Sequence, residues 1–317
     1  HELFAKLEDY LLKYVDIKFD TTVEDLIIEN NICKGVKIFN SFKPKDKEEI
    51  YGKNIVLAVG RVGANFLSDL CDKHNIASSC GSVDIGIRYE LPDKVMEKIN
   101  KYLYEGKFIG RVGIFGDKVR TFCQNPSGFV STEVYDENII LANGHSYKEK
   151  KSNNTNLAIL ASHHFTSPFD KPLEYGRNIA KNLNELGGGK LVVQRFGDLT
   201  SGHRSYEKDI KNNSVVPTLK DASAGDISFG LSYRTVTDII AMIKKVDKVV
   251  PGFANPDNLM YGPEIKFYSN VITLNKDFET NIKNLYAIGD GAGLTTGLIM
   301  ASSSGVQMGR ILANKIN

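Results

Sequence analysis

The chain has 317 residues, a length typical of about two domains. Hydrophobic residues make up 42% and charged residues 25%, an ordinary globular composition that excludes a disordered or fibrous chain. Forty Lys and Arg residues against thirty-eight Asp and Glu leave a net charge of +2, which gives no reason to expect nucleic acid or an anionic membrane as partner. No apolar run approaches the ~18 residues of a spanning helix, and no signal peptide opens the chain.

The four cysteines, at positions 33, 71, 80 and 123, form no CxxC pair and are too sparse for a disulfide scaffold. They predict a reduced, cytoplasmic setting. Residue 1 is His and not Met, so we expect either a processed N-terminus or a fragment of a longer protein. The motifs described below favour the fragment.

The first eighty residues alternate between helical and extended patterns. Apolar residues at i, i+3 and i+4 predict an amphipathic helix over 1–14. Short β-rich runs predict strands, with turn chemistry from Asn30-Asn31 and Gly35 between the last two; the runs are 15–19, 22–30 and 34–40. The charged stretch 42–49 predicts an exposed loop. The apolar run 54–60 predicts a strand buried on both faces, and a helix follows at about 63–74.

From about residue 81 the chain becomes a mosaic of short strands and turns. An alternating strand is predicted at 82–90 and a helix near 92–103. Further strands are predicted at 118–130, 138–144, 155–160 and 190–198. Helices are predicted at 171–186 and 234–246. This block, 81–265, is interpreted as an inserted mixed α/β domain.

The last segment, 284–317, predicts a short apolar strand, a GDGAG turn and a long helix. Gly289, Gly291 and Gly293 would let the backbone approach a ligand closely at the carboxyl end of a buried strand. The helix start supplies free N–H groups and a partial positive charge. The carboxylate of Asp290 would repel a phosphate and suits sugar-like hydroxyls, which suggests a polyol-bearing cofactor. A plain turn between strand and helix is an equally good interpretation of the motif alone.

Two separated segments carry a resemblance to a known family. NIVLAVGRVG (54–63), followed by NLYAIGDGAG (284–293), resembles the glutathione-reductase-like flavoproteins, whose cofactor is FAD. Intervening stretches resemble the bacterial FAD-dependent, or NAD(FAD)-utilising, dehydrogenases of unknown substrate; they are VDIGIRYE (83–90), VRTFCQNPSGFV (119–130), TNLAIL (155–160), VQRFGDL (193–199), PTLKDASAGD (217–226) and YGPEIKFYS (261–269). The resemblance covers essentially the whole chain.

The resemblance implies a set of cofactor contacts. Val59, Gly60 and Arg61 would lie near the diphosphate or ribose of FAD, and Gly289 and Asp290 would contact the ribitol and diphosphate. The residues that would border the isoalloxazine edge are Gly291, Gly293, Leu294, Thr295 and Thr296. Backbone N–H donors there would favour the reduced flavin, which carries negative charge near N1 and the C2 carbonyl.

The chain departs from the family in one respect, because it contains no N-terminal G-x-G-x-x-G unit. We therefore expect an α/β fold with an incomplete FAD/NAD(P)-binding Rossmann-like domain, formed by 1–80 and 266–317, and an inserted substrate or cap domain at 81–265. The chain alone is expected to bind FAD weakly or not at all. The expected function is that of the C-terminal portion of an FAD-dependent oxidoreductase, a dehydrogenase acting on a small-molecule substrate, with NAD(P)H as a candidate electron donor. The missing N-terminal segment of the same protein is then its partner.

Catalytic candidates are weak. A redox or nucleophilic role for Cys123 competes with a buried, inert thiol, which is favoured. The polar loop 197–209 suits either a lid over the flavin or a disordered insertion. Arg195, His203 and Arg204 are the basic groups that could bind an acidic substrate or a nicotinamide phosphate. Glu264 is the best lone carboxylate, although pairing with a Lys or Arg is favoured. No metal-ligand spacing is present.

Three rival functions stay open. A flavin-dependent nucleic-acid-modifying enzyme would need a clustered basic face, which the near-neutral charge disfavours. A non-catalytic binding module on a flavoprotein scaffold would tolerate Asp290→Ala. A cofactor-free hydrolase is disfavoured because neither a G-x-S-x-G elbow nor a metal pattern is present.

Overall fold

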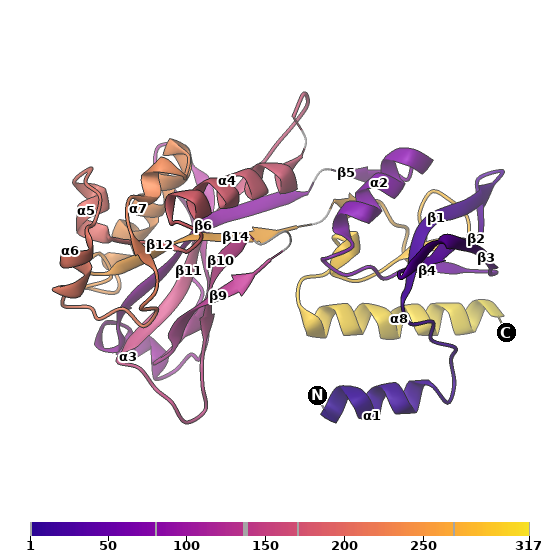
Figure 1. Cartoon of the computed structure of the whole chain (residues 1–317), viewed down its shortest axis with the longest axis horizontal. Helices are drawn as coiled ribbons and strands as arrows, with labels where there is room; N and C mark the ends of the chain where they lie inside the picture. Colours follow the sequence, from indigo (N-terminus) through magenta and orange to yellow (C-terminus); the bar gives the residue numbers. More distant parts are fainter. Residues whose placement is uncertain (1, 80, 136–138, 170, 269, 317) are drawn as a thin grey trace. The chain divides into compact units, whose positions relative to one another are not determined.

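The computed structural model describes residues 2–79, 81–135, 139–169, 171–268 and 270–316. The chain divides into two compact units. Unit 1 comprises His1–Ser79 and Val271–Asn317, and unit 2 comprises Cys80–Asn270. Together they make a mixed α/β protein whose largest sheet has seven strands and lies in unit 2 (Figure 1).

Unit 1 begins with a helix and a three-stranded antiparallel meander. Its elements are α1 (Glu2–Leu11), β1 (Thr21–Glu29), β2 (Ile32–Asn40), β3 (Lys43–Tyr51), β4 (Ile55–Leu57), α2 (Ala64–His74), β5 (Ser78–Ser79), β15 (Val271–Ile272), β16 (Leu285–Ala287), η3 (Asp290–Ala292) and α8 (Leu298–Ile316). Asn30 and Asn31 both have positive φ, of 50° and 61°, which is the conformation of a tight hairpin turn between β1 and β2. Gly35 serves a different purpose, because a Cβ there would collide with the Ile50 carbonyl of β3.

Two sequence predictions for unit 1 were wrong. Residues 15–19 form no strand, and the charged stretch 42–49 lies mostly in β3. The β3 side chains are mostly exposed, as expected for a loop, but the backbone of β3 pairs with β2, and charged side chains pair across the strands. Lys47 pairs with Glu24 of β1 at 2.6 Å, and Lys37 of β2 pairs with Glu49 at 3.9 Å. Local charge therefore hid a strand whose pairing is set by its neighbours.

A short parallel pair forms the centre of unit 1. β4 and β16 pair in parallel, with Ile55 opposite Leu285 and Leu57 opposite Ala287. The predicted strand at 54–60 is thus only three residues long, and it is half-buried where burial on both faces was expected. Both strands end in glycine-rich turns, the first leading to α2 and the second to η3 and α8. The two turns therefore lie at the same edge of the pair.

Unit 2 is built on the large mixed sheet, ordered β13-β12-β14-β6-β11-β8-β7. Its elements are β6 (Ser82–Pro92), α3 (Asp93–Asn100), β7 (Ile109–Val112), β8 (Asp117–Asn125), β9 (Phe129–Val134), β10 (Ile140–His145), β11 (Asn154–His164), α4 (Pro172–Leu186), β12 (Val192–Arg195), α5 (Phe196–Thr200), α6 (Glu207–Lys211), β13 (Ser223–Ala224), η2 (Ile227–Phe229), α7 (Tyr233–Asp247) and β14 (Leu259–Phe267).

The two faces of β6 differ in chemistry. Odd-numbered residues, from Val83 to Leu91, join one apolar core with residues of α4 and α7, which lie on the same side of the sheet (Figure 1). Even-numbered residues include the buried charged side chains Asp84, Arg88 and Glu90. This alternation is the period of two that the sequence predicted for 82–90, but the second face is a buried polar layer.

Sequence reading misplaced several boundaries in unit 2. The predicted strand 118–130 is two strands, β8 and β9, separated by a turn that contains Ser127 with φ of 49°. The predicted strand 190–198 ends at Arg195 and continues as α5. Residues 197–209 are not a disordered insertion, since α5, a turn and the start of α6 occupy them. Strand β14 was not predicted, because Gly262-Pro263 interrupts its pattern.

Candidate cofactor site

The candidate site lies where the two glycine-rich turns of unit 1 meet. The turn after β16 presses against the turn after β4 at Gly291, where a Cβ would lie 2.5 Å from the Gly60 carbonyl oxygen and 2.7 Å from Val59 Cγ2. Gly63 likewise leaves room for Val59, because a Cβ on residue 63 would lie 2.5 Å from the Cβ of Val59. Gly291 is therefore the packing glycine that brings the two turns into contact, whereas Gly63 allows the first turn to close on itself.

Two other glycines of these turns face open space. Gly60 and Gly289 have positive φ, of 63° and 75°, and a Cβ on either would meet nothing within 4 Å. Their conformation is strained for other residues, and their backbone is accessible to a ligand. Gly293, with φ of 69°, ends η3 in the left-handed conformation.

Asp290 ties the second turn together. Its Oδ1 accepts a hydrogen bond from the Thr295 hydroxyl at 2.6 Å, and its Oδ2 accepts one from the Gly297 N–H at 3.0 Å and one from Arg61 Nε at 3.2 Å. Burial alone would raise the pKa of Asp290, but these hydrogen bonds and the charge of Arg61 outweigh it and hold the pKa below its usual value. The carboxylate of Asp290 therefore stabilises the conformation of the loop that leads to α8.

A cavity of about 460 Å³ opens at this point; its lining residues are Ala58, Gly60, Arg61, Ile288, Gly289, Asp290, Gly297, Leu298 and Ala301. Its walls are largely apolar, with one cation and one carboxylate at its edge. Leu298 begins α8, so the unpaired N–H groups of a 19-residue helix start beside the cavity. Such a site suits a ligand with a flat apolar body and electron-rich edges.

The cavity contains some of the residues that the sequence singled out. Gly60, Arg61, Gly289 and Asp290 line it, whereas Val59 and Gly291 lie outside the lining and pack against each other. The remaining predicted residues, Gly293, Leu294, Thr295 and Thr296, lie in the loop outside the lining. Sequence reasoning missed Gly297, Leu298 and Ala301. The helix that it predicted after GDGAG was the available signal, because its first turn had to face the same edge.

These residues fit an FAD-like group on the evidence of the cavity itself. Gly60 and Gly289 expose their backbone to the cavity, and a Cβ on either residue would reduce the space that is available to a ligand. Arg61, with its side chain half exposed, could meet a phosphate, and the start of α8 could meet an electron-rich ring edge. Asp290 retains one unused acceptor position on Oδ1, which suits a hydroxyl.

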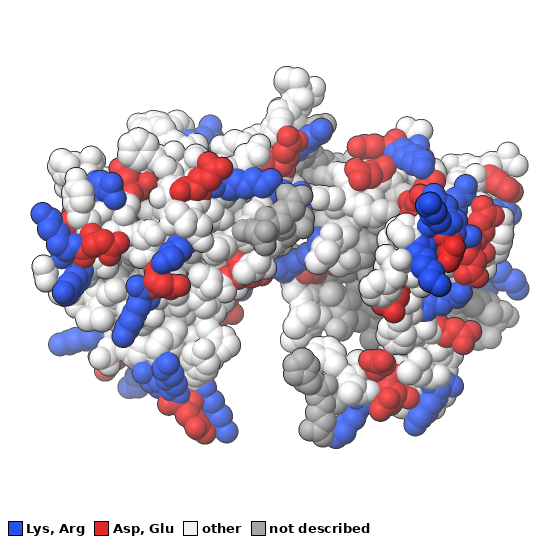
Figure 2. Space-filling model, viewed as in Figure 1, with Lys and Arg blue, Asp and Glu red and all other residues white. Residues whose placement is uncertain are grey.

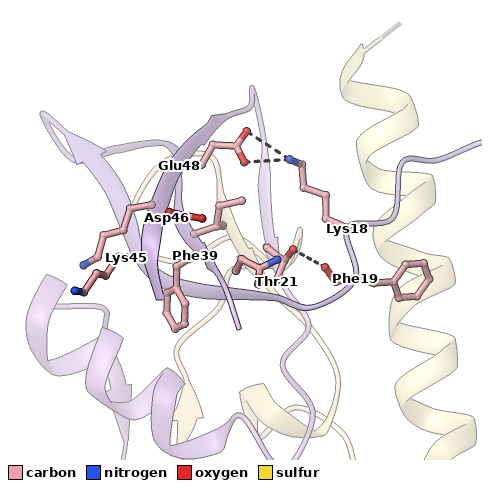
Figure 3. A pocket seen from close by; sticks show the side chains of 10 residues that line it. Lys18, Phe19, Thr21, Phe39, Lys45, Asp46 and Glu48 are labelled. Carbon is pink, nitrogen blue, oxygen red and sulfur yellow. Dashed lines mark hydrogen bonds and ion pairs between the residues drawn. The ribbon is translucent and has the colours of Figure 1, made fainter. Parts of the chain in front are cut away.

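Unit 1 has another, larger pocket, in which several of the polar side chains pair with one another. It measures about 660 Å³ and lies beside β2 and β3 (Figure 3). Lys18 donates to both oxygens of Glu48, at 3.4 and 3.1 Å, and Thr21 donates to the Phe19 carbonyl at 2.8 Å. Because four exposed charged side chains of β3 line this pocket and its described lining includes no glycine, we place the candidate site at the glycine turns.

The catalytic candidates of unit 2 are engaged in internal contacts. Glu264 is fully buried, with Arg88 Nη1 3.4 Å from its Oε1 and Lys266 Nζ at 3.5 Å, so the prediction that it pairs with a cation is confirmed. Cys123 is half-buried and has φ of 49°; its carbonyl accepts hydrogen bonds from Arg88 at 3.0 Å and Asn125 at 2.7 Å. Cys71 is buried, and Cys80 lies outside the described residues.

The basic candidates around residue 200 differ from one another. Arg195 contacts Asp257 at 2.5 Å and Asp198 at 3.5 Å, and the hydrogen bond to Asp257 is the main reason that its pKa is raised. Its guanidinium is thus already neutralised. His203 and Arg204 are exposed. Arg204 stacks over Tyr206 at 4.9 Å and donates to the Ala224 carbonyl at 3.1 Å.

The sequence reasoning did not single out the polar layer of unit 2. Glu90 is buried and accepts hydrogen bonds from Asn154, Thr218 and Tyr261, the last at 2.6 Å. Burial raises the pKa of Glu90, and these donors act in the opposite direction. The signal was present in VDIGIRYE, where charged residues alternate with a fully apolar face.

Within the part of the chain that the structure describes, no group of three or more His, Cys, Asp or Glu side chains is placed to hold a metal ion. Among those same residues, no helix is both long enough and apolar enough to cross a bilayer.

Comparisons with known proteins identify relatives. The family model described as "FAD-dependent protein, C-terminal domain-like" matches residues 83–266. A Clostridium beijerinckii protein described as uncharacterized is 25% identical over 300 residues, which cover 84% of this chain and 54% of that protein. The chain therefore spans about half the length of the curated relative it matches.

Solved structures give weaker likenesses. A quinol–fumarate reductase with menaquinol is 12% identical, with a TM-score of 0.38 over 98% of this chain and 47% of that one. The glycerol-3-phosphate dehydrogenase of Bacillus halodurans complexed with FAD is 13% identical, with a TM-score of 0.21 over 51% of this chain and 26% of that one. TM-scores this low support no argument about fold or function.

Proposed function

Because the chain belongs to the family of FAD-dependent proteins defined by this C-terminal domain, we propose that it is the C-terminal portion of an FAD-dependent oxidoreductase whose cofactor contacts lie at the paired glycine turns of unit 1. The observation that carries the proposal is the cavity of about 460 Å³ at the ends of β4 and β16. Its open glycines, its single cation and the start of α8 are groups that suit part of a flavin nucleotide.

Each residue of the site has a distinct task in this proposal. FAD, when bound, supplies the two-electron redox chemistry, with NAD(P)H as a candidate donor. Gly60 and Gly289 have no side chain, so the cofactor would contact the backbone directly at these two positions. Arg61 would bind the phosphates of the cofactor. Asp290 keeps the loop before α8 in shape and offers its free Oδ1 position to a hydroxyl. The N–H groups of the first turn of α8 stabilise negative charge on the reduced ring.

A feature of β4 supports the idea that more chain completes the site. Within the described residues, β4 pairs only with β16, so its other edge carries unpaired backbone groups around Val56. A cavity of about 500 Å³ lies beside this strand; its lining residues are Val23, Val36, Asn54, Ile55, Val56, Leu57, Ala58, Val59 and Phe66. We infer that a further parallel strand covers this edge in the whole protein, and that the chain alone binds FAD weakly or not at all.

The two units take different roles in the proposal. Unit 1 is the remainder of a Rossmann-like FAD-binding domain, and unit 2 determines the small-molecule substrate. The part of the chain that the family model matches lies in unit 2. A nucleic-acid substrate finds no support in Figure 2, where Lys and Arg are interspersed with Asp and Glu over the face shown.

The test uses the full-length protein beside this chain. We expect the full-length protein to show the visible absorption bands of a bound flavin, and this chain to show none after FAD is added and the free cofactor is removed. Neither protein binding flavin would contradict the proposal. Tight FAD binding by this chain alone would contradict only the need for further chain.

A pair of variants on α8 locates the site. Leu298→Glu places a carboxylate in the cavity at a side chain that is 88% exposed, so the fold should tolerate it. We expect it to weaken FAD binding by the full-length protein at least tenfold. Asn314→Glu, on the same helix and outside the cavity lining, is the matched control and should leave the affinity unchanged. Equal affinities for both variants would argue against this site.

A further inference from the structure

A buried carboxylate in unit 2 has no conventional partner. Asp238 of α7 is fully buried, and neither of its carboxylate oxygens accepts a hydrogen bond from an N–H or hydroxyl group of the described residues. An unpaired buried carboxylate is costly, so some other group must compensate it. Arg234, one helical turn before Asp238 on α7, hydrogen-bonds Asp117 at the start of β8, so the Asp117 carboxyl lies next to that of Asp238.

The turn of the β7–β8 hairpin covers this carboxyl. Gly113 has φ of 67°, and a Cβ there would lie 2.9 Å from Asp238 Oδ1. Arg111 Nη1 donates to the Gly116 carbonyl at 3.1 Å and so closes the hairpin, while Lys245 of α7 donates to the Arg111 carbonyl at 3.2 Å. Asp238 is therefore at the contact between α7 and the hairpin.

The charges around the pair do not neutralise both carboxylates. Arg234 of α7 forms two hydrogen bonds with Asp117, one of them at 2.7 Å from Nη2, and its guanidinium lies 4.9 Å from the ring centroid of Phe115. His163 of β11 faces the group through Thr235, with Nε2 2.9 Å from its hydroxyl, but burial lowers the pKa of His163 and keeps it neutral near pH 7. Two carboxylates thus share one arginine.

A second carboxylate next to the first is stable when the two share a proton, as in other close carboxyl pairs. Such a proton would let Asp238 donate to Asp117 while Asp117 also accepts from Arg234. We propose that Asp117 and Asp238 share one proton and that this proton operates a latch, which holds the β7–β8 hairpin on α7 and loosens when the proton is lost to solvent.

The electrostatics set the working range of the latch. Burial, together with the neighbouring Asp117, raises the pKa of Asp238 to about 6, whereas Arg234 lowers the pKa of Asp117. Because the raised pKa belongs to the closed state, the closed state is favoured at low pH and weakened as pH rises through 6. Asp84 raises the pKa of His163 and His164 lowers it. The groups that shift the pKa of Asp238 are Asp117 and Arg234, together with burial. The latch lies within unit 2 and does not depend on the flavin proposal.

Amide hydrogen exchange of the whole chain, followed by mass spectrometry, tests the latch. After correction for intrinsic exchange rates, we expect the opening equilibrium of peptides from 109–125 to increase about tenfold between pH 5 and pH 7.5, since the acid has a pKa of about 6 when closed and an ordinary value when open. Equal protection at the two pH values would overturn the proposal.

Variants separate the latch from other titrations. Asp238→Asn should keep the hairpin protected at both pH values, because an amide can donate to Asp117 without ionising. Asp221→Asn, an exposed residue of the same unit, and His163→Gln should retain the tenfold change. Loss of the change in His163→Gln would assign it to the histidine and overturn the proposal.

A direct titration keeps the proposal testable even if Asp238→Asn does not fold. Carbon-13 NMR of the side-chain carboxyl of Asp238 in the unmodified chain should titrate with a midpoint near 6. A midpoint near the ordinary value of 3.8 would overturn the proposal.

Discussion

Unit 2 covers both faces of its central sheet, whereas unit 1 leaves its parallel pair open at one edge. In unit 2, α4 and α7 cover the apolar face of β6, and the other face is a buried polar layer in which Glu90 accepts from Tyr261 and Arg88 pairs with Glu264. In unit 1, large apolar side chains remain exposed; on α8 they are Leu298, Ile299, Met300 and Val306, and on α1 they include Phe4, Leu7 and Tyr10. Exposed apolar side chains gathered on one helix are typical of an interaction site, so α1 and α8 are the parts of unit 1 that we expect to be covered by a partner.

The largest effect is expected from breaking the polar layer of unit 2. Arg88→Met leaves the fully buried Glu264 without its principal cation and should cost about 3–5 kcal/mol in the free energy of unfolding. Urea denaturation followed by circular dichroism measures it. The double variant Arg88→Met with Glu264→Gln should recover part of the loss, since the fully buried carboxylate charge is removed together with that of Arg88, although Lys266 then loses its partner. A single variant as stable as the unmodified chain would show that the layer contributes little.

The contact between the two glycine turns is the corresponding weak point of unit 1. Gly291→Ala forces a Cβ against the Gly60 carbonyl and should cost about 2 kcal/mol in the stability of unit 1. Gly305→Ala in α8 meets nothing within 4 Å and should be neutral or slightly stabilising. Thermal unfolding of both variants measures the difference, and equal melting temperatures would contradict the packing role of Gly291.

A smaller, pH-dependent effect is expected at the edge of unit 1. Burial would raise the pKa of Asp25, but hydrogen bonds from Lys73 at 2.7 Å and His74 at 2.7 Å outweigh it and lower the pKa to about 2. Since the folded pKa is depressed, the stabilisation is present above pH 4 and is lost as pH falls toward 2. After solvent screening, Asp25→Asn should cost about 1 kcal/mol at pH 7 and nothing near pH 2. A cost independent of pH would exclude an electrostatic origin.

The smallest effect is expected at Arg61, whose side chain is 52% exposed. Arg61→Met should change the stability by less than about 0.5 kcal/mol, because exposed ion pairs contribute little. The pKa of Asp290 should nevertheless rise toward its ordinary value, which carboxyl NMR can detect. An unchanged pKa would show that Thr295 and Gly297 hold the carboxylate without help from Arg61.

The sequence predicted those parts of the molecule that local chemistry determines. Periodicity gave α2, α4 and α7 nearly to their ends, and the glycine pattern predicted both turns of the candidate site. It failed where distant partners decide, as in β3, whose charges are paired between strands, and β14, whose Gly262-Pro263 step looked like a break. The pairing of Asp290 with Arg61 was equally unpredictable, because Arg61 lies more than two hundred residues away in the chain.

The alternation along β6 also has a consequence for how unit 2 reaches its fold. A one-residue shift in the pairing of β6 with β11 would turn Arg88 and Glu90 toward α4 and α7, and would leave Ile87 and Tyr89 facing the polar layer. Burying the charged side chains in the apolar core and the apolar side chains in the polar layer would both be unfavourable, so an intermediate with this misaligned pairing would be unstable. The buried charges therefore act as a check on alignment during folding, rejecting arrangements that a purely apolar sheet would tolerate.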